Sequence, residues 1–354
     1  MQPRLLTVLR CPVTLEPLDL EIIEQTEVFR DTTRASGALV PSAEDREPEV
    51  IAGWLTAAKS GYRYPIVDGV PRLLVDTRLA RPTDPTGSPN APDQSLSSEY
   101  RQTVEHFRTQ WENYAEEEKI FGRDVEASWR YFRETLCPPD VSDDWFRGRS
   151  ILDAGCGHGK YVDALSRRGI EVFALDITPE VGRVYRKFHR RSNVHVVQAN
   201  ILHPPIAHGT MDYVFSNGVI HHTPNTRGAF HALGRLVRNG GYLAVWVYPF
   251  RSPAFATVSQ FLRSFTTRMP RAVLRPLCYL PVPLLSIPGW EAYSKTSLRN
   301  ASWRECAQVV YDFFGPKYQT HHTPAELSQW YLEEGFEIPW IGPDPLSAAA
   351  RKTA

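Results

Sequence analysis

The sequence predicts an α/β protein, in which a mostly parallel sheet covered by helices on both faces follows a small β-rich domain. Two observations predict this fold class. Strand-like and helix-like patterns alternate from about residue 150 onward, as is typical of parallel sheets. The N-terminal segment 1–78 instead shows short apolar runs separated by turn residues. The 354 residues suffice for a domain of about 150–250 residues and a smaller module.

Composition and charge indicate an ordinary globular chain. Hydrophobic residues make up 42% and the net charge is zero. The first 100 residues hold 10 basic and 15 acidic side chains and the remainder 30 and 25, which is too mild an imbalance for a nucleic-acid-binding surface. No apolar run approaches the roughly 20 residues that span a bilayer, and residues 1–10 lack a secretory signal. We therefore expect a cytoplasmic protein without a membrane span.

The five cysteines are scattered along the chain, and no two of them form a Cys-x-x-Cys pair. Structural zinc sites usually draw their ligands from such neighbouring pairs. Disulfide scaffolds need an even, dense set of cysteines in an oxidising compartment. The sequence therefore predicts reduced thiols and no metal site.

The N-terminal half is expected to contain three segments. Residues 1–78 form the β-rich domain and residues 79–99 a proline-rich linker. Residues 100–149 form a helical lead-in or cap, whose helical pattern stops at Pro138 and Pro139. Within the first segment a polar stretch is expected to be a loop, and four apolar runs are expected to be strands. The loop is 31–49, and the strands are 5–9, 18–22, 64–67 and 73–75.

The first segment resembles the small Trm112-like zinc-ribbon domains. The resemblance rests on Cys11-Pro12-Val13-Thr14 and on residues 64–74, Tyr-Pro-Ile-Val-Asp-Gly-Val-Pro-Arg-Leu-Leu. Metal-bearing relatives have a second cysteine at the position of Thr14 and a further pair upstream of the Tyr-Pro-Ile segment, and both are absent here. The resemblance therefore implies a ribbon without zinc, and an unrelated β-rich appendage is the alternative.

A cofactor site is expected where a strand, a glycine-rich turn and a helix follow one another. The strand 150–153 leads into Ala-Gly-Cys-Gly-His-Gly at 154–159, and a helix begins at 160. Glycines let a ligand approach the backbone closely because no Cβ intervenes. A second strand ends at Asp176, about 20 positions on, where a carboxylate can accept hydrogen bonds from the ribose hydroxyls of an adenosine. Thr178 is expected to cap the helix that follows.

A dinucleotide-binding enzyme is the runner-up for this pattern. Dinucleotide sites favour Gly-x-Gly-x-x-Gly, whereas the third glycine here comes one position early. The acidic Asp153 at the start of the loop suits a ligand with an amino group and a sulfonium better than it suits a pyrophosphate. Both details favour an adenosyl amino acid.

Residues 153–159 resemble the first motif of class I S-adenosylmethionine (SAM)-dependent methyltransferases (type 11/25-like) almost letter for letter. Residues 194–201, 211–222 and 238–245 are similar to later strands and loops of that family, in order. The resemblance implies a Rossmann-like core at 150–248 with a mostly parallel seven-stranded sheet, completed by residues 301–354, and SAM as cofactor. It implies these cofactor-binding residues: Asp153, Gly155, Gly157, Gly159, Asp176, Ile177, Asn200, Ile201 and Asn217. Asn200 can alternatively be an ordinary loop residue.

Two histidines after the fourth strand are the candidate catalytic residues. They follow the sheet's carboxyl edge, where ligands bind in open α/β folds, and a histidine there can serve as a base. His222 is the first choice and His221 the second, and packing beneath the cofactor is the alternative role. The similar His321-His322-Thr323-Pro324 is expected to be structural, since Thr323 and Glu326 form a capping-box pattern.

Residues 249–300 are expected to form an apolar lid, with a helix at 255–268. The alternatives are a packing or dimer surface and contact with a membrane surface through Arg263, Arg268, Arg271 and Arg275. The lid, the neutral charge and the aromatic content favour methyl transfer to a small apolar or aromatic acceptor, of the kind found in specialised metabolism, with homodimerisation left open. The alternatives are an RNA methyltransferase and a SAM-binding protein without transferase activity.

Overall fold

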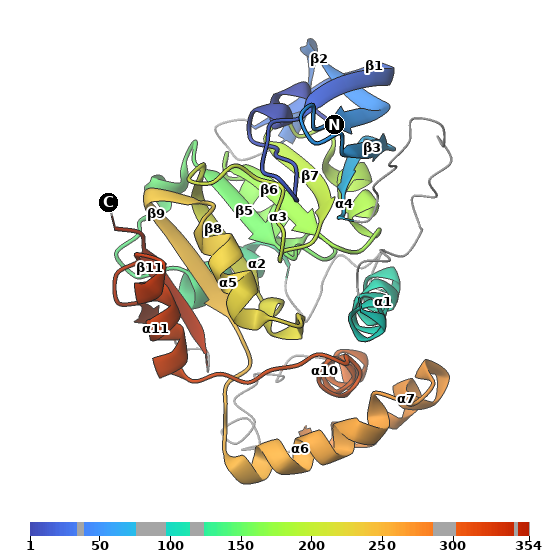
Figure 1. The fold of residues 1–354 in the computed structure, drawn as a ribbon, viewed down its shortest axis with the longest axis vertical. Coiled ribbons are helices and arrows are strands. Elements are labelled where there is room, and N and C mark those ends of the chain that lie inside the picture. Colours follow the sequence, from blue (N-terminus) through green and yellow to red (C-terminus); the bar gives the residue numbers. More distant parts are fainter. Residues whose placement is uncertain (34–38, 76–96, 114–123, 286–301, 343–345, 354) are drawn as a thin grey trace.

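Eleven strands form one sheet in the part of the chain that the computed structural model describes, residues 1–33, 39–75, 97–113, 124–285, 302–342 and 346–353. The strand order is β1-β2-β3-β4-β7-β6-β5-β8-β9-β11-β10 (Figure 1). After β1–β4 at one edge, the chain enters the sheet at the central β5, adds β6 and β7 on one side and then places the remaining strands on the other.

Seven of these strands form the predicted, mostly parallel core. Five of them run parallel, in the order β7-β6-β5-β8-β9, and β11 lies antiparallel to β9 with β10 at the edge. The prediction of a Rossmann-like core is confirmed. The bounds are β5 (Ser150–Ala154), β6 (Glu171–Asp176), β7 (Val194–Ala199), β8 (Met211–Asn217), β9 (Val237–Trp246), β10 (Trp340–Ile341) and β11 (Ser347–Arg351).

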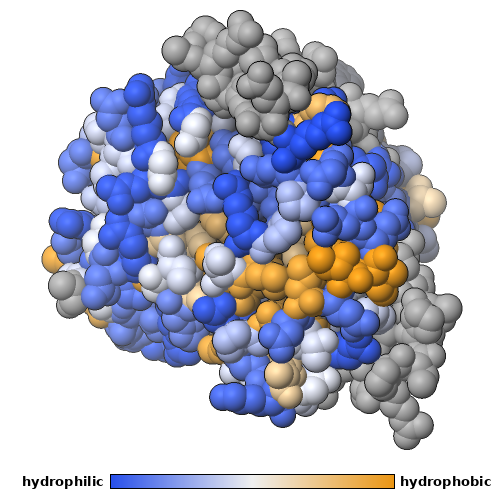
Figure 2. Space-filling model, turned by 90° about the horizontal axis from the view of Figure 1, so that it is seen from above, coloured by the Kyte–Doolittle hydropathy of each residue, from blue (hydrophilic) through white to orange (hydrophobic). Residues whose placement is uncertain are grey.

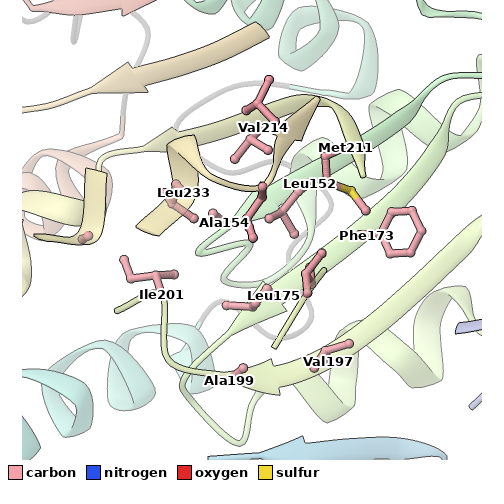
Figure 3. Packing of buried hydrophobic residues seen from close by; sticks show 14 of the residues in the cluster. Leu152, Ala154, Phe173, Leu175, Val197, Ala199, Ile201, Met211, Val214 and Leu233 are labelled. Atoms are coloured by element: carbon pink, nitrogen blue, oxygen red, sulfur yellow. The ribbon is translucent and has the colours of Figure 1, made fainter. Parts of the chain in front are cut away.

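Both faces of the core sheet are covered, because its strands are apolar on both sides. One hydrophobic cluster joins the strands to α2 (Val125–Leu136), α3 (Lys160–Ser166) and α4 (Val181–Phe188). A second cluster joins the other face to α5 (Thr226–Gly234) and α11 (Pro324–Glu333) (Figure 3). As predicted, α2 ends just before Pro138 and Pro139.

The N-terminal segment 1–75 adds four strands to the β7 edge of this sheet. These strands, β1 (Asp19–Thr33), β2 (Leu39–Thr56), β3 (Arg63–Val67) and β4 (Val70–Leu73), form an antiparallel meander. The last of them, β4, pairs in parallel with β7. Leu5, Leu9 and Leu55 of this segment belong to the same buried cluster as Leu152 of β5. The two parts of the chain therefore share a hydrophobic core.

Buried polar groups strengthen the contact between the N-terminal strands and α4. The Arg30 guanidinium bonds Glu49 at 2.5 Å, and the Tyr185 hydroxyl of α4 donates to Glu49 at 3.0 Å. Arg30 also donates to the backbone oxygen of His189 at 2.5 Å. A buried ion pair is retained only where such additional hydrogen bonds satisfy both charges.

The structure corrects three local predictions. The stretch 31–49, expected to be a loop, belongs largely to the β1–β2 hairpin, apart from 34–38, which lie outside the described residues. Side chains 21–27 of β1 are all exposed, and the buried Arg30 and Glu49 are charged, so no apolar alternation marks this part of the hairpin. Residues 5–9 begin in a 3₁₀ helix, Pro3–Thr7, instead of a strand. Thr178 does not cap α4, because its hydroxyl is bonded to Asp176.

Within the described residues, α6 (Pro253–Thr266), α7 (Arg271–Leu277), α8 (Val282–Leu285) and α10 (Trp303–Phe314) lie beyond the carboxyl edge of the sheet (Figure 1). The small apolar cluster around Leu274 and Tyr311 joins α7, α8 and α10. The expected helix at 255–268 corresponds to α6 and is confirmed. Residues 286–300 of the expected lid and 79–96 of the expected linker lie outside the described residues, and the domain boundaries stay predictions.

The described helices include none that combines the length and the apolar character needed to cross a bilayer. Viewed from above Figure 1, the molecule is mostly hydrophilic, with one group of hydrophobic residues near its centre (Figure 2). No three histidine, cysteine, aspartate or glutamate side chains gather as metal ligands within the described part of the chain.

Candidate functional site

The candidate site lies where the strand order reverses, beside the carboxyl ends of β5 and its neighbours β6 and β8. In open α/β sheets the crevice at this point is where ligands bind. The loop 155–159 leaves β5 here and leads into α3. The amides of Gly155 and Cys156 both donate to the carbonyl oxygen of Leu175, at 2.7 and 3.0 Å, which folds the loop back over β6.

Positive backbone angles explain the glycines at two positions of this loop. Gly155 has a φ of 97°, and a Cβ there would meet the Val219 side chain at 2.5 Å. Gly157 has a φ of 54°, and a Cβ there would meet the Trp111 ring at 2.8 Å. Gly159, with a φ of 85°, precedes the first turn of α3. Side chains at these positions would therefore strain the loop and fill the space above it.

Asp176, at the end of β6, is tied to the glycine loop. One carboxylate oxygen accepts the Gly157 amide at 2.9 Å, and the other accepts the amide and hydroxyl of Thr178, both at 2.8 Å. Burial raises the pKa of this carboxyl in spite of these hydrogen bonds. The structure thus brings the predicted ribose-binding acid against the predicted loop.

Asp153 stands out because it is a buried carboxyl group with an oxygen that lacks a hydrogen bond. Its side chain is 2% exposed, and Oδ2 has no hydrogen-bond partner among the described residues. Burial, against the attraction of Lys160, raises its pKa to about 8. An orphaned carboxyl of this kind is stabilised by a cation placed beside it.

The remaining predicted cofactor residues lie around the same edge. Asn200 is buried, and its Oδ1 accepts the Leu202 amide at 3.0 Å and lies 3.4 Å from the Tyr100 hydroxyl. The carbonyl of Ile177 accepts the Gln198 side chain at 2.9 Å, and Ile201 packs in the core. The Asn217 amide donates to the Tyr161 hydroxyl at 2.6 Å.

Both candidate histidines are buried in the short helix Ile220–His222 after β8. Nδ1 of His222 lies 2.9 Å from the carbonyl oxygen of Tyr318. A carbonyl can only accept, so Nδ1 carries the proton and Nε2 keeps its lone pair. Burial lowers the pKa of His222 to about 3. His221 is fully buried, and neither of its ring nitrogens has a hydrogen-bond partner among the described residues.

Helix α1 (Ser98–Asn113) contributes three aromatic residues that the sequence patterns did not identify as functional. Tyr100 lies by Asn200, the Phe107 ring is 4.9 Å from that of His222, and the Trp111 ring is 5.3 Å from that of His158 in the glycine loop. Their spacing of seven and four positions places them on one helix face. That spacing was the available signal, but it does not show what the face contacts.

A group of aromatic rings extends from the histidines toward α6. The ring of Tyr248 lies 4.2 Å from His221, 5.7 Å from Phe313 and 5.9 Å from His321. Phe255 of α6 is 6.0 Å from Phe313. His321 and His322 were expected to be structural. The expected Thr323–Glu326 capping box is present, and His321 is also part of this aromatic group.

Comparison with known proteins identifies the family of the core. Residues 152–245, which contain the glycine loop, Asp176 and both histidines, match the family described as a methyltransferase domain. This segment is similar to that family, and we refer to residues 152–245 below as the methyltransferase domain.

The methyltransferase domain also has curated relatives. An uncharacterised methyltransferase of Mycobacterium tuberculosis is 37% identical over 95 residues, 27% of this chain and 48% of that protein. A ubiquinone biosynthesis O-methyltransferase of Alkalilimnicola ehrlichii is 33% identical over 99 residues, 27% of this chain and 40% of that protein. The chain thus spans about half or less of the length of these relatives.

Solved structures show weaker similarity. The Burkholderia thailandensis 1,6-didemethyltoxoflavin-N1-methyltransferase is 18% identical, with a TM-score of 0.41 and coverage of 73% of this chain and 92% of that chain. Human N-acetylserotonin methyltransferase is 14% identical, with a TM-score of 0.42 and coverage of 74% and 61%.

SAM, the cofactor that the resemblance implies, fits the site of the methyltransferase domain. The orphaned Asp153 oxygen suits its positively charged amino acid part, and the Asp176 carboxylate suits ribose hydroxyls. The glycines let the Val219 and Trp111 side chains pack directly against the loop, where a Cβ at 155 or 157 would clash with them. The orphaned Asp153 oxygen is the feature that a cationic ligand would satisfy.

Proposed function

We propose that this chain is a SAM-dependent methyltransferase that acts on a small apolar or aromatic acceptor. The observation that carries the proposal is the buried Asp153, whose Oδ2 has no hydrogen-bond partner in the described chain, beside the glycine loop and Asp176 at the reversal of the sheet. Bound SAM supplies a methyl group activated by the sulfonium. The chain holds the cofactor and the acceptor in line and excludes water from them.

The aromatic surroundings of His222 support an apolar acceptor. Phe107 from α1 and Tyr248, which follows β9, place rings beside the histidine pair, and Phe313 near the end of α10 lies against Tyr248. Thr103 of α1 accepts the amides of Lys317 and Tyr318 at 3.1 and 3.2 Å, which fixes α1 against the segment that orients His222. The names of the ubiquinone relatives, which are O-methyltransferases, are consistent with a small acceptor.

Calorimetry tests the cofactor assignment directly. The wild-type chain is expected to release or absorb heat on titration with SAM or its demethylated product, S-adenosylhomocysteine, and to give none with a nicotinamide or flavin nucleotide. Binding of a nucleotide without binding of either adenosyl compound would contradict the proposal. Incubation with SAM and a pool of small acceptors would then distinguish a transferase from a SAM-binding protein, since only a transferase yields a methylated product.

We further propose that Nε2 of His222 receives the proton of the acceptor during transfer. General-base groups contribute about 10²- to 10⁴-fold to a rate, and a base of low pKa falls at the lower end of that range, so His222→Ala is expected to lower kcat by about 100-fold. Because burial lowers its pKa to about 3, the histidine is neutral throughout the physiological range, and the wild-type rate is not expected to show a titration near pH 6.5.

The matched control is His208→Ala, which removes an exposed histidine from the loop before β8. It is expected to leave kcat and KM unchanged. Unaltered turnover of His222→Ala on a verified acceptor would exclude the base role and leave His222 as a packing residue. His221→Ala is expected to affect stability more than the pH profile of the rate.

We also propose that residues 1–78 are a Trm112-like ribbon. In it the carboxylate of Glu16, in place of a metal ion, links two turns of the chain. The turn at Cys11–Glu16 and the turn at Ala57–Gly61 face each other. Glu16 accepts the amides of Lys59 and Ser60, both at 3.1 Å, and the hydroxyl of Thr14 at 3.0 Å. The Ser60 hydroxyl donates to the same carboxylate.

The Glu16→Gln variant is expected to melt at a lower temperature than the wild type at neutral pH, since these hydrogen bonds lower the pKa of Glu16. A lowered pKa gives stability that is present above the ordinary value of 4.5 and is lost as the pH falls through the folded-state value. The variants should therefore converge in acid. Glu24→Gln, on exposed β1, is the control, and an equal loss in both variants would contradict the cross-link.

A further inference from the structure

Helix α6 exposes its apolar face and turns its polar face toward the protein, the reverse of an ordinary surface helix. Its large apolar side chains Val258, Phe261, Leu262 and Phe265 are 44–64% exposed, and they recur at the i, i+3, i+4, i+7 spacing of one helix face. The opposite stripe, which faces the protein, contains the polar Ser259 and Arg263, followed by Thr267 just beyond the helix. A soluble helix normally buries the apolar stripe and exposes the polar one.

Arg263 holds the helix in this orientation. It is 4% exposed, and its guanidinium donates to the carbonyl oxygens of Pro316 at 2.7 Å and Lys317 at 3.3 Å and to Gln319 Oε1 at 2.7 Å. It also donates to the carbonyl oxygen of Phe313. Turning α6 to bury its phenylalanines would carry Arg263 out to solvent and leave these buried acceptors without their donor, which is unfavourable.

The exposed apolar surface continues through α7 and the turn after it. Val273 is 50%, Leu277 40%, Tyr279 44% and Leu280 72% exposed, whereas Leu274 and Cys278 face the small cluster with Tyr311. We call the eight exposed side chains of 258–280 the α6–α7 face. Its two helices follow one another along the outer edge of the molecule, away from the sheet (Figure 1). A contiguous apolar surface of this kind marks an interaction site.

Charge shows which partner suits the α6–α7 face. Residues 249–285 contain five arginines and no lysine, aspartate or glutamate. Arg251 and Arg268 are exposed, and Arg271 and Arg275 are partly exposed. The packed neighbour α1 offers Glu105, which pairs with Arg271 at 3.2 Å. The segment as a whole is therefore cationic and apolar together, which is the composition of helices that lie in the interface of an anionic membrane.

We propose that the α6–α7 face binds the surface of an anionic lipid bilayer, with Phe261 and Phe265 inserted among the acyl chains and the exposed arginines at the phosphate headgroups. A second copy of the chain would have to place the same cationic segment against itself, which disfavours a self-interface. The proposal goes beyond methyl transfer. It also gives an apolar acceptor a route to the site, because Phe255 on the inner side of α6 belongs to the aromatic group.

Vesicle flotation tests the proposal on the full chain. The wild type is expected to float with vesicles of equal parts phosphatidylglycerol and phosphatidylcholine, and to float much less with phosphatidylcholine alone or in high salt. The double variant Phe261→Ser/Phe265→Ser is expected to lose binding by about tenfold or more. Arg268→Glu is expected to lose about fivefold for each unit of charge removed.

The control is Leu332→Ser/Ile338→Ser, which removes exposed apolar side chains from α11 and the turn after it and is expected to float like the wild type. Affinity for S-adenosylhomocysteine should be the same in all these variants, so failure of this proposal is distinguishable from failure of the methyltransferase assignment. Absence of flotation with anionic vesicles would overturn it. A dimer in solution that Phe261→Ser/Phe265→Ser converts to monomer, without vesicle binding, would assign the face to self-association instead.

Discussion

The Asp176→Asn variant is expected to bind SAM and S-adenosylhomocysteine about 100-fold more weakly than the wild type. Hydrogen bonds to a charged acceptor contribute about 1.5–3 kcal/mol each, and the proposed ribose contact involves two hydroxyls. Asparagine keeps the size of the side chain but removes the charge and one acceptor oxygen. Isothermal calorimetry at a fixed pH measures the loss.

Asp176 also holds the loop through the Gly157 amide, so a structural effect has to be separated from a ligand effect. Thr178→Ala removes one hydrogen bond to the same carboxylate and is expected to weaken binding only a few-fold. Glu171→Gln changes a carboxyl at the opposite end of β6 and should leave affinity unchanged. Equal losses in Asp176→Asn and Glu171→Gln would contradict the ribose assignment.

The affinity of the wild type for SAM is expected to depend on pH through Asp153. In the ligand-free chain the pKa of this carboxyl is about 8 because of its burial. Below that pH the carboxyl must lose its proton before it can pair with a cation, so affinity should rise about tenfold per pH unit up to about pH 8. Above it the ligand's amino group, whose ordinary pKa is about 8, loses its charge. The Asp153→Asn variant should bind weakly and without this rise.

Asp153→Asn weakens SAM binding in this account, but it is expected to raise the stability of the ligand-free chain. A carboxyl with a raised pKa favours the folded state below its ordinary pKa of 3.8, and this contribution is lost as the pH rises through about 8. Ligand-free Asp153→Asn should therefore melt at a higher temperature than the wild type at about pH 9, and the difference should shrink toward about pH 4. Thermal melts without S-adenosylhomocysteine measure this difference in stability. The rise in melting temperature on adding S-adenosylhomocysteine measures the difference in affinity.

Two outcomes would contradict this account of Asp153. The first is an affinity of the wild type that does not change between about pH 6 and pH 8. The second is an Asp153→Asn variant that is less stable than the wild type at high pH, which would mean that the ionised carboxyl has a partner in the ligand-free chain. Asp212→Asn is unsuitable as a control, because Asp212 is paired with Arg149 and Arg238.

The glycine loop and its two acidic residues could be predicted because their signal is local. Strand, turn, helix and the second strand lie within about 30 consecutive residues, and each glycine is required by a backbone angle that only glycine adopts readily. The strand expected at 18–22 corresponds to the start of β1, but the rest of the β1–β2 hairpin could not be predicted, since side chains 21–27 are exposed and the buried Arg30 and Glu49 are charged.

The aromatic residues that α1 contributes to the site could not be predicted from the sequence, for a different reason. Tyr100, Phe107 and Trp111 come well before the glycine loop in the sequence, on a separate helix, and their spacing shows a shared face without showing its partner. Long-range packing of α1 against Tyr318 and the loop brings them to the site. The same holds for His222, whose tautomer is set by a carbonyl group 96 positions further along the chain.

The sequence by itself predicted the strand and helix alternation of the core and the glycine loop after β5, both of which the structure contains, because these depend on patterns between near neighbours. Only the tertiary structure decided that an Asp153 oxygen lacks a hydrogen-bond partner among the described residues, that the segment 1–75 shares the core of the domain, and which side of α6 faces outward. The last of these depends on Arg263, since a buried guanidinium must keep its distant carbonyl acceptors even where that exposes phenylalanine.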